Sequence, residues 1–227
     1  MSVLAYRKEP IMAEKLTIKK VDNKVNLLAE KVADLAKVFS DFVTPKTCDS
    51  KGKSFEPVKR DFSKPEWHTY EFKDGNYEIA TADENGVLVF RDAIFEAPFD
   101  DKDDWRKCTN DWNKCTLKPL LEKWWEENAP QVLKDNYDVD LLNDYEIFDK
   151  DQMSEDYRIG NQLAMFKDWH NRIKGLKGNR YSTWWWTKTA LRGYVYLAFF
   201  VFPTGYRNFN YAYTTSGVVP CLRPKHQ

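Results

Sequence analysis

The sequence lacks an excess of either charge, a signal peptide and a long apolar run. Lys and Arg together number 35, as do Asp and Glu, so the formal net charge is zero. Phosphate binding normally needs a surplus of positive charge, which argues against nucleic acid as the main partner. The first fifteen residues contain no apolar stretch of signal-peptide length, and the nine-residue run from Tyr194 to Phe202 is too short to span a membrane. We therefore expect synthesis in a host cytoplasm and no membrane insertion.

Cysteine and histidine are also scarce. The four cysteines, at positions 48, 108, 115 and 221, include no C-x-x-C pair and have no histidine near them in sequence. Free thiols in a reducing compartment are expected rather than zinc or a disulfide framework. The acidic stretch from Asp100 to Asp104 lacks the spacing of a calcium loop and predicts a solvated loop. With no phosphate loop, His-Glu-x-x-His motif or nucleophile elbow, the sequence predicts no catalysis, no metal and no cofactor.

Residues 18–43 carry an unbroken heptad pattern. Its apolar residues recur at alternating spacings of three and four, namely Ile18, Val21, Val25, Leu28, Val32, Leu35, Phe39 and Phe42. A seam this regular is typical of a parallel coiled coil, because a helix packed on its own domain usually shows a wider stripe with a drifting period. The β-branched a positions suit a dimer, but flanking Ala29, Ala36 and Val38 widen the apolar face and permit three strands. We predict a homo-oligomer, favouring a trimer over a dimer.

Two segments without periodicity flank this helix. Residues 1–17, interrupted by Pro10, are either an attachment peptide or a segment without fixed structure. Residues 44–66 contain Pro45, Pro57 and Pro65 among many Lys and Ser, which predicts a semi-extended linker. A separate domain is then expected over residues 67–227.

Residues 67–175 of that domain predict a mixture of strands and helices. The Lys73–Asn76 turn between alternating runs predicts a hairpin over 67–80, and a further strand is expected over 87–95. Residues 117–125 predict an amphipathic helix with Pro119 in its first turn. Its apolar face would comprise Leu117, Leu120, Leu121, Trp124 and Trp125. Residues 139–142 predict a strand or a turn, and 162–173 another short amphipathic segment.

Residues 181–223 are where the core is expected. Three consecutive tryptophans, Trp184 to Trp186, would alternate on a strand, so at least one should face outward or toward a partner chain. The apolar run from Tyr194 to Phe202 predicts a strand buried on both faces. The Pro203–Gly205 turn joins it to a second strand over 206–215, forming a hairpin. The fold class predicted for the chain is therefore α+β, with an N-terminal coiled-coil helix before the domain.

Four motifs occur in a distinctive order between residues 90 and 223. They are Asn110-Asp111-Trp112 with Thr116-Leu117, the Trp124-Trp125 helix, Trp184-Trp185-Trp186, and the hairpin with its closing Gly217-Val218-Val219-Pro220. This order resembles a bacterial and phage domain family of uncharacterised function with a C-type-lectin-like fold, related to the formylglycine-generating, sulfatase-modifying fold. Members usually close with Gly-Val-Arg-Pro. Here Val219 stands in place of that arginine, so no role of the arginine carries over.

The resemblance implies a C-type-lectin-like domain with antiparallel hairpins and two short helices, used as a binding scaffold. Relatives of this fold include the tips of phage fibres and the ligand-binding proteins varied by diversity-generating retroelements. Tyr, Arg and Asn near a turn suit such contacts, since they offer large area with few rotors and retain hydrogen bonds. The candidate ligand-binding residues are Arg192, Tyr194, Tyr206, Arg207, Asn208, Phe209, Asn210 and Tyr211.

Together these features predict a non-enzymatic phage virion protein. It would be a homotrimeric capsid (head) or tail fibre that attaches to the virion through its N-terminus and binds a host-surface protein or glycan through its head. The alternative is a variable ligand-binding protein of a bacterium or prophage, diversified by a retroelement. A modifying enzyme of the formylglycine-related fold, using Cys221, is the third reading.

Overall fold

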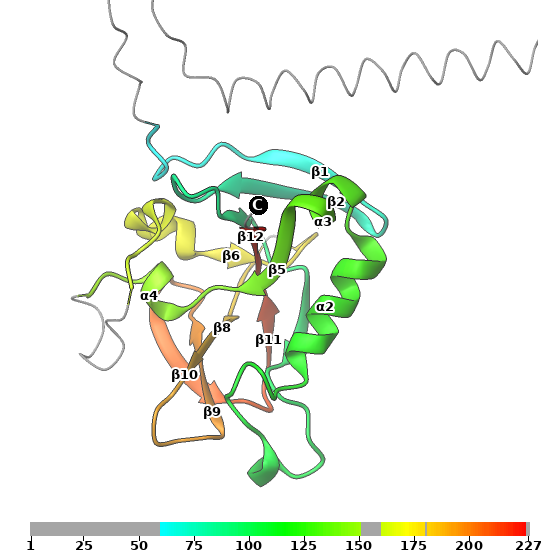
Figure 1. The fold of residues 1–227 in the computed structure, drawn as a ribbon. Helices are drawn as coiled ribbons and strands as arrows, with labels where there is room; N and C mark the ends of the chain where they lie inside the picture. Colours follow the sequence, from blue (N-terminus) through cyan, green and yellow to red (C-terminus); the bar gives the residue numbers. More distant parts are fainter. Residues whose placement is uncertain (1–59, 151–159, 180, 226–227) are drawn as a thin grey trace, which may run out of the picture. The chain divides into compact units, whose positions relative to one another are not determined.

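The computed structural model of the chain describes residues 60–150, 160–179 and 181–225, all of which belong to one compact unit that begins at Arg60 (Figure 1). The predicted attachment peptide, the coiled-coil seam from Ile18 to Phe42 and most of the predicted linker lie outside the described residues. Residues 60–66, predicted as the end of the linker, lie against the domain, where the Asn171 side chain donates to the Ser63 carbonyl at 2.8 Å.

The described residues form a mixed fold of sheets and three short α-helices. The strands are β1 (His68–Phe72), β2 (Gly75–Thr81), β3 (Leu88–Phe90), β4 (Phe95–Pro98), β5 (Tyr137–Leu141), β6 (Lys174–Gly175), β7 (Ser182–Thr183), β8 (Trp185–Ala190), β9 (Leu197–Val201), β10 (Arg207–Tyr211), β11 (Thr215–Val218) and β12 (Pro220–Pro224). The α-helices are α2 (Leu117–Asn128), α3 (Gln131–Asn136) and α4 (Asp144–Ile147), and the 3₁₀ helices are η1 (Trp105–Lys107), η4 (Ala164–Lys167) and η5 (Trp169–Arg172). No helix among these is long and apolar enough to cross a bilayer.

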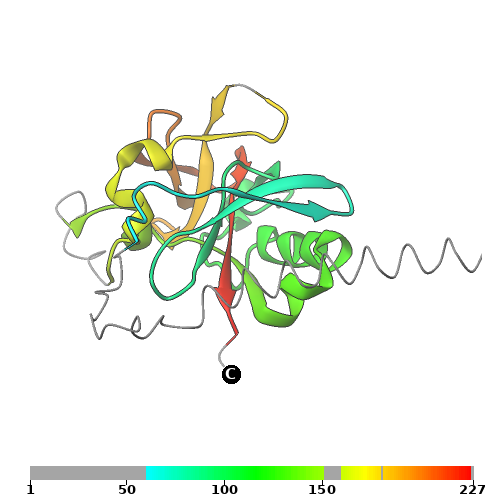
Figure 2. The ribbon, with the colours of Figure 1, turned by 90° about the horizontal axis from the view of Figure 1, so that it is seen from above.

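Two five-stranded sheets share the C-terminal segment. The first has the order β1-β2-β3-β12-β5 and is antiparallel throughout. The second has the order β10-β9-β8-β11-β4, and only its β8–β11 pair is parallel. Because β11 and β12 are separated only by the buried Val219, this segment ties both sheets together (Figure 1). Helices α2 and α3 pack beside β5, on one side of the first sheet (Figure 2).

The tryptophan triplet lies at the centre of the second sheet. Trp185 and Trp186 are both completely buried, because β8 is covered on its two faces, whereas Trp184 is 42% exposed. Each buried indole N–H finds a main-chain acceptor at 2.9 Å, from Trp185 to the Arg172 carbonyl and from Trp186 to the Ala97 carbonyl. The prediction that at least one tryptophan faces outward is confirmed, by Trp184.

The hairpin predictions are confirmed, with shifted boundaries. β1 and β2 pair with Phe72 opposite Gly75, where a φ of 129° requires glycine. β9 and β10 pair as predicted. The buried strand, however, starts at Leu197 and not at Tyr194, which is 52% exposed in the preceding loop. The second strand ends at Tyr211, and Thr215 already belongs to β11.

Three further expectations need correction. The strand predicted over 87–95 is two strands, β3 and β4, separated by a bend. Helix α2 buries Leu117, Leu121, Trp124 and Trp125 as predicted, but Leu120 is 46% exposed. The acidic stretch is not wholly solvated, since Asp100 is completely buried. Its carboxylate accepts hydrogen bonds from the main-chain N–H groups of Thr109 and Thr116, at 2.8 and 3.0 Å, which explains why a charge is tolerated there.

Candidate ligand-binding surface

Five aromatic side chains form one continuous cluster on the surface, which we call the aromatic patch. Its members are Trp105 of η1, Tyr194 and Tyr196 of the loop before β9, Tyr211 at the end of β10, and Tyr213 in the turn that follows. Ring centroids lie 5.8 Å apart for Trp105 and Tyr196, 6.0 Å for Tyr196 and Tyr211, and 5.2 Å for Tyr211 and Tyr213. Tyr194 meets Tyr196 edge-on at 6.4 Å.

The patch is open to solvent although its rings support one another. Trp105, Tyr194, Tyr211 and Tyr213 are between 41% and 52% exposed. Val195, beside Tyr194, is 63% exposed and extends the apolar area. Contiguous exposed apolar area of this kind marks interaction sites more often than isolated surface residues do. The segments that carry it meet where β9 begins and β10 ends, on the side where η1 projects (Figure 1).

Asn110 holds the loop that carries Tyr194 and Tyr196. This residue is 6% exposed, and its side-chain amide donates to the carbonyls of Leu191, Tyr194 and Leu197 at 3.0, 3.0 and 2.7 Å. Its main-chain N–H donates to the Val195 carbonyl at 2.6 Å. One buried residue therefore ties four main-chain carbonyls of this loop together, and it adds to the main-chain hydrogen bonds that the Leu191 and Tyr194 carbonyls also accept.

A second set of hydrogen bonds joins the other segments of the patch. The main-chain N–H of Ala212 donates to the Tyr196 carbonyl, and that of Asp100 donates to the Ala212 carbonyl, both at 2.9 Å. The Asp100 carboxylate then anchors the segment from residue 100 to residue 116, which contains Trp105. The rings thus stand on fixed main chain, which lowers the entropy lost when a ligand binds.

Two of the sequence-predicted ligand residues, Tyr194 and Tyr211, belong to the patch. Arg192 is exposed in the same loop, two residues before Tyr194. Tyr206 is 71% exposed but precedes β10, at the far end of that strand from Tyr211. Phe209, in the middle of β10, is 50% exposed and meets the buried Phe199 edge-on at 6.3 Å. The predicted residues from Tyr206 to Tyr211 therefore lie along the whole length of β10. Of these, only Tyr211, at the end of the strand, belongs to the patch.

Arg207 is engaged within the domain. Its Nε donates to Asp144 Oδ2 at 2.5 Å, and its guanidinium carbon lies 3.7 Å from the centroid of the Phe199 ring. Asp144 is completely buried and also accepts a hydrogen bond from the Thr187 hydroxyl at 2.6 Å. Burial raises the pKa of Asp144, and the charge of Arg207 and the Thr187 hydrogen bond oppose that rise. Arg207 therefore forms a structural ion pair, and its predicted ligand contact stays a prediction.

Asn208 and Asn210 cover the free edge of β10. This strand is the last of its sheet, and its residues 207, 209 and 211 point their main-chain N–H groups away from β9. Asn208 Oδ1 accepts from the N–H of Phe209 at 2.9 Å, and Asn210 Oδ1 accepts from the N–H of Tyr211 at 2.8 Å. Each amide therefore occupies a donor that a foreign strand would otherwise use.

Sequence reasoning missed Trp105, Tyr196 and Tyr213 as members of the site, and Asn110 as its support. A usable signal was present for the tyrosines, because residues 194 and 196, and 211 and 213, recur with a spacing of two. Trp105 gave no such signal, since it directly follows the acidic stretch and lies far from the tyrosines in sequence. That Trp105 lies beside the tyrosines follows only from the hydrogen bonds of Asp100, which hold the segment from residue 100 to residue 116 in place.

The described cysteines are buried thiols without a disulfide, in agreement with the prediction of free thiols. They are Cys108, Cys115 and Cys221. Burial raises the pKa of each of these thiols, which makes them poor nucleophiles at neutral pH. Among residues 60–150, 160–179 and 181–225, no group of three or more His, Cys, Asp or Glu side chains is placed to hold a metal ion.

No protein-family model matches the chain, and no curated protein or solved structure matches it either.

Proposed function

We propose that the protein is a non-enzymatic, homotrimeric appendage of a phage virion, on the capsid or tail, whose head binds a protein or glycan of the host surface. The aromatic patch is the observation that carries this proposal. Tyr and Trp rings supply large contact area at small entropic cost, and Tyr keeps a hydroxyl for hydrogen bonding. Here such rings gather on loops that Asn110 and Asp100 hold in place.

We also propose the C-type-lectin-like fold for the head. In its support, the segments that carry the resemblance appear in the expected order: helix α2 with Trp124 and Trp125, strand β8 with Trp185 and Trp186, the β9–β10 hairpin, and β11 with β12. The final strand β12 lies in the same sheet as β1, so the start and the end of the domain share one sheet. Loops on such a frame can vary without disturbing the core.

The trimeric stalk is proposed from the heptad seam alone. Three heads on one coiled coil would raise the effective concentration of each weak site without any new contact. We expect polar substitution of Leu28 and Leu35 to convert the oligomer to a monomer in light scattering, with tryptophan fluorescence unchanged. All nine tryptophans lie at or beyond residue 67, so this signal reports the head alone. If the variant has the same mass as the wild type, the proposed coiled-coil stalk is wrong. If the wild type is itself a monomer, the proposed fibre is wrong.

A retroelement-diversified binding protein is the second candidate. In its support, the exposed residues Tyr194, Val195, Tyr206, Phe209, Tyr211 and Tyr213 all lie near the C-terminus, outside the buried core. The gene neighbourhood separates the two proposals. Portal, capsid and tail genes beside this one favour the virion, whereas a reverse transcriptase gene beside a near-identical template repeat favours diversification.

A further inference from the structure

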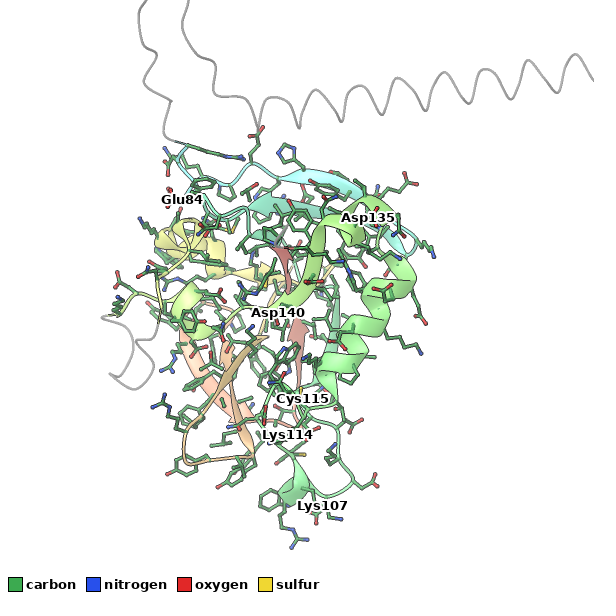
Figure 3. The ribbon with its side chains drawn as sticks, viewed as in Figure 1. Glu84, Lys107, Lys114, Cys115, Asp135 and Asp140 are labelled. Atoms are coloured by element: carbon green, nitrogen blue, oxygen red, sulfur yellow. The ribbon has the colours of Figure 1, made fainter. Side chains whose placement is uncertain are left out.

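A polar cleft lies next to the aromatic patch on the same domain. It has a volume of about 880 Å³ and is formed by residues 110–113, one side of α2, and parts of β5, β8 and β12. This volume falls in the range of about 300–1,000 Å³ that small-molecule sites occupy. Asn110 and Ala190 are among its lining residues, and the patch loop begins directly after Ala190, at Leu191. Figure 3 shows Asp140 on this face, with Lys114 and Lys107 following toward η1.

The floor of the cleft is a fixed network of charges. Asp140 Oδ2 accepts from Lys188 Nζ and, at 2.7 Å, from Arg223 Nε. Arg223 also donates to both carboxylate oxygens of Glu146, at 2.8 and 2.9 Å. Two cations and two anions thus compensate one another. A charged ligand on this floor would have to separate pairs whose side chains are mostly withdrawn from water, and so a neutral ligand is favoured.

The walls of the cleft offer hydrogen bonds of both kinds. Asn113, together with Lys118 and Glu122 of α2 and Asp138 of β5, lines the cleft. Of these, Asn113, Glu122 and Asp138 are exposed, and they present amide N–H donors and carbonyl or carboxylate acceptors. In all, three basic and four acidic side chains line the cleft, so its charge is nearly balanced.

An aromatic side chain completes the lining. Trp112 is half-buried, with its ring 6.0 Å from that of Phe99, and the remainder of it borders the cleft. This combination of aromatic surface, donors and acceptors with little net charge matches ligands that have many hydroxyl groups and flat C–H faces.

We propose that this cleft is a second binding site, and that it takes a neutral saccharide. The hydroxyls would bond to Asn113, Glu122 and Asp138, and a sugar face would pack against Trp112. The site differs from the aromatic patch and does not depend on it, although a polysaccharide that enters the cleft at Asn110 would continue toward Tyr194.

Saturation-transfer NMR on the full-length protein tests the proposal. The probes are cellohexaose, maltohexaose, chitohexaose and xylohexaose, with hexagalacturonate as the charged comparison. We expect at least one neutral probe to bind. The double variant Glu122→Ala, Asp138→Ala should weaken that binding by about tenfold or more. Tyr211→Ala should leave it within about twofold, because Tyr211 lies outside the cleft.

The matched control is Glu84→Ala, Asp135→Ala, which removes two exposed carboxylates that do not line the cleft (Figure 3). It should bind like the wild type. The proposal is overturned if no neutral probe binds, if hexagalacturonate binds as well as the neutral probes, or if the cleft variant behaves like its control. Binding lost only in Tyr211→Ala would move the saccharide to the aromatic patch, which overturns the cleft site and leaves the proposed function intact.

Discussion

Asn110 donates from its side-chain amide to the main-chain carbonyl of Tyr194, 3.0 Å away, across 84 residues of sequence. The same amide also donates to the carbonyls of Leu191 and Leu197, so its removal would take away three hydrogen bonds that tie this loop to Asn110. We expect Asn110→Ala to lower the free energy of unfolding by about 1–3 kcal/mol. It should also speed amide hydrogen exchange in residues 191–197, which mass spectrometry would detect.

Asn113→Ala is the matched control for that variant, since Asn113 lies three residues further on and is exposed. It should change neither the unfolding free energy nor the exchange. Equal exchange in the wild type and Asn110→Ala would show that the loop is held by other contacts.

Lys174 should make the stability of the head depend on pH. The side chain is 1% exposed, donates to the Phe90 carbonyl at 3.0 Å and lies over the Trp67 and Phe166 rings. Burial lowers the pKa of Lys174 to about 7, with nearby Arg91 adding to the effect and Asp92 opposing it. Between about pH 7 and the ordinary lysine pKa near 10.4, the unfolded chain binds more protons than the folded one. Stability should therefore rise with pH through this window and stay level below it.

Lys174→Met tests this expectation, because it fills the same space without a charge. Urea unfolding followed by tryptophan fluorescence should show the variant to be more stable than wild type at pH 7 by about 1 kcal/mol or more, with the gap closing by pH 10. A difference that stays constant with pH would mean that the amine has the same pKa in the folded and unfolded chains, so that Lys174 stays charged in the folded protein across this range.

Arg207→Ala should destabilise the head and not merely reduce ligand binding. It would leave the completely buried Asp144 carboxylate without its ion pair, at a cost of about 3–5 kcal/mol. Adding Asp144→Asn removes the stranded charge and should restore part of the loss, which chemical denaturation would measure. A melting temperature unchanged in Arg207→Ala would contradict the structural role of this ion pair.

The asparagines on β10 should protect the head from strand pairing. In the double variant Asn208→Ala, Asn210→Ala, the outward N–H groups of Phe209 and Tyr211 lose their side-chain acceptors. We expect concentration-dependent association of this variant beyond that of the wild type in light scattering, with little change in the free energy of unfolding. The exposed Thr204→Ala, in the turn before β10, serves as control. No added association would show that the edge is protected by other means.

Local patterns were sufficient to predict much of the head. The alternating residues on either side of the Lys73–Asn76 turn predicted β1 and β2. The helical spacing of Leu117, Leu121, Trp124 and Trp125 predicted the buried face of α2. The β9–β10 hairpin followed in the same way from its turn. In each case the pattern lies within a few residues, because neighbouring side chains on one face share the same environment.

Features that depend on distant partners could not be predicted. Asp100 resembles its acidic neighbours in sequence, and only the N–H groups of Thr109 and Thr116 make its burial possible. In the sequence, residues 194–196 begin an apolar run that predicts a strand. In the structure they form an exposed loop, which Asn110 holds by hydrogen bonds to the Tyr194 and Val195 carbonyls. Asn208 and Asn210 have the composition of ligand contacts, and their role follows from β10 being at a sheet edge.

The central claim is that the aromatic patch binds the host surface. The most direct measurement is the binding of fluorescently labelled full-length protein to cells of the bacterium in which the gene is propagated, comparing wild type with Tyr194→Ala, Tyr211→Ala. Both tyrosines are about half exposed, so the variant should melt like the wild type, and it should bind cells at least about tenfold more weakly. Undiminished binding by this folded variant would contradict the claim.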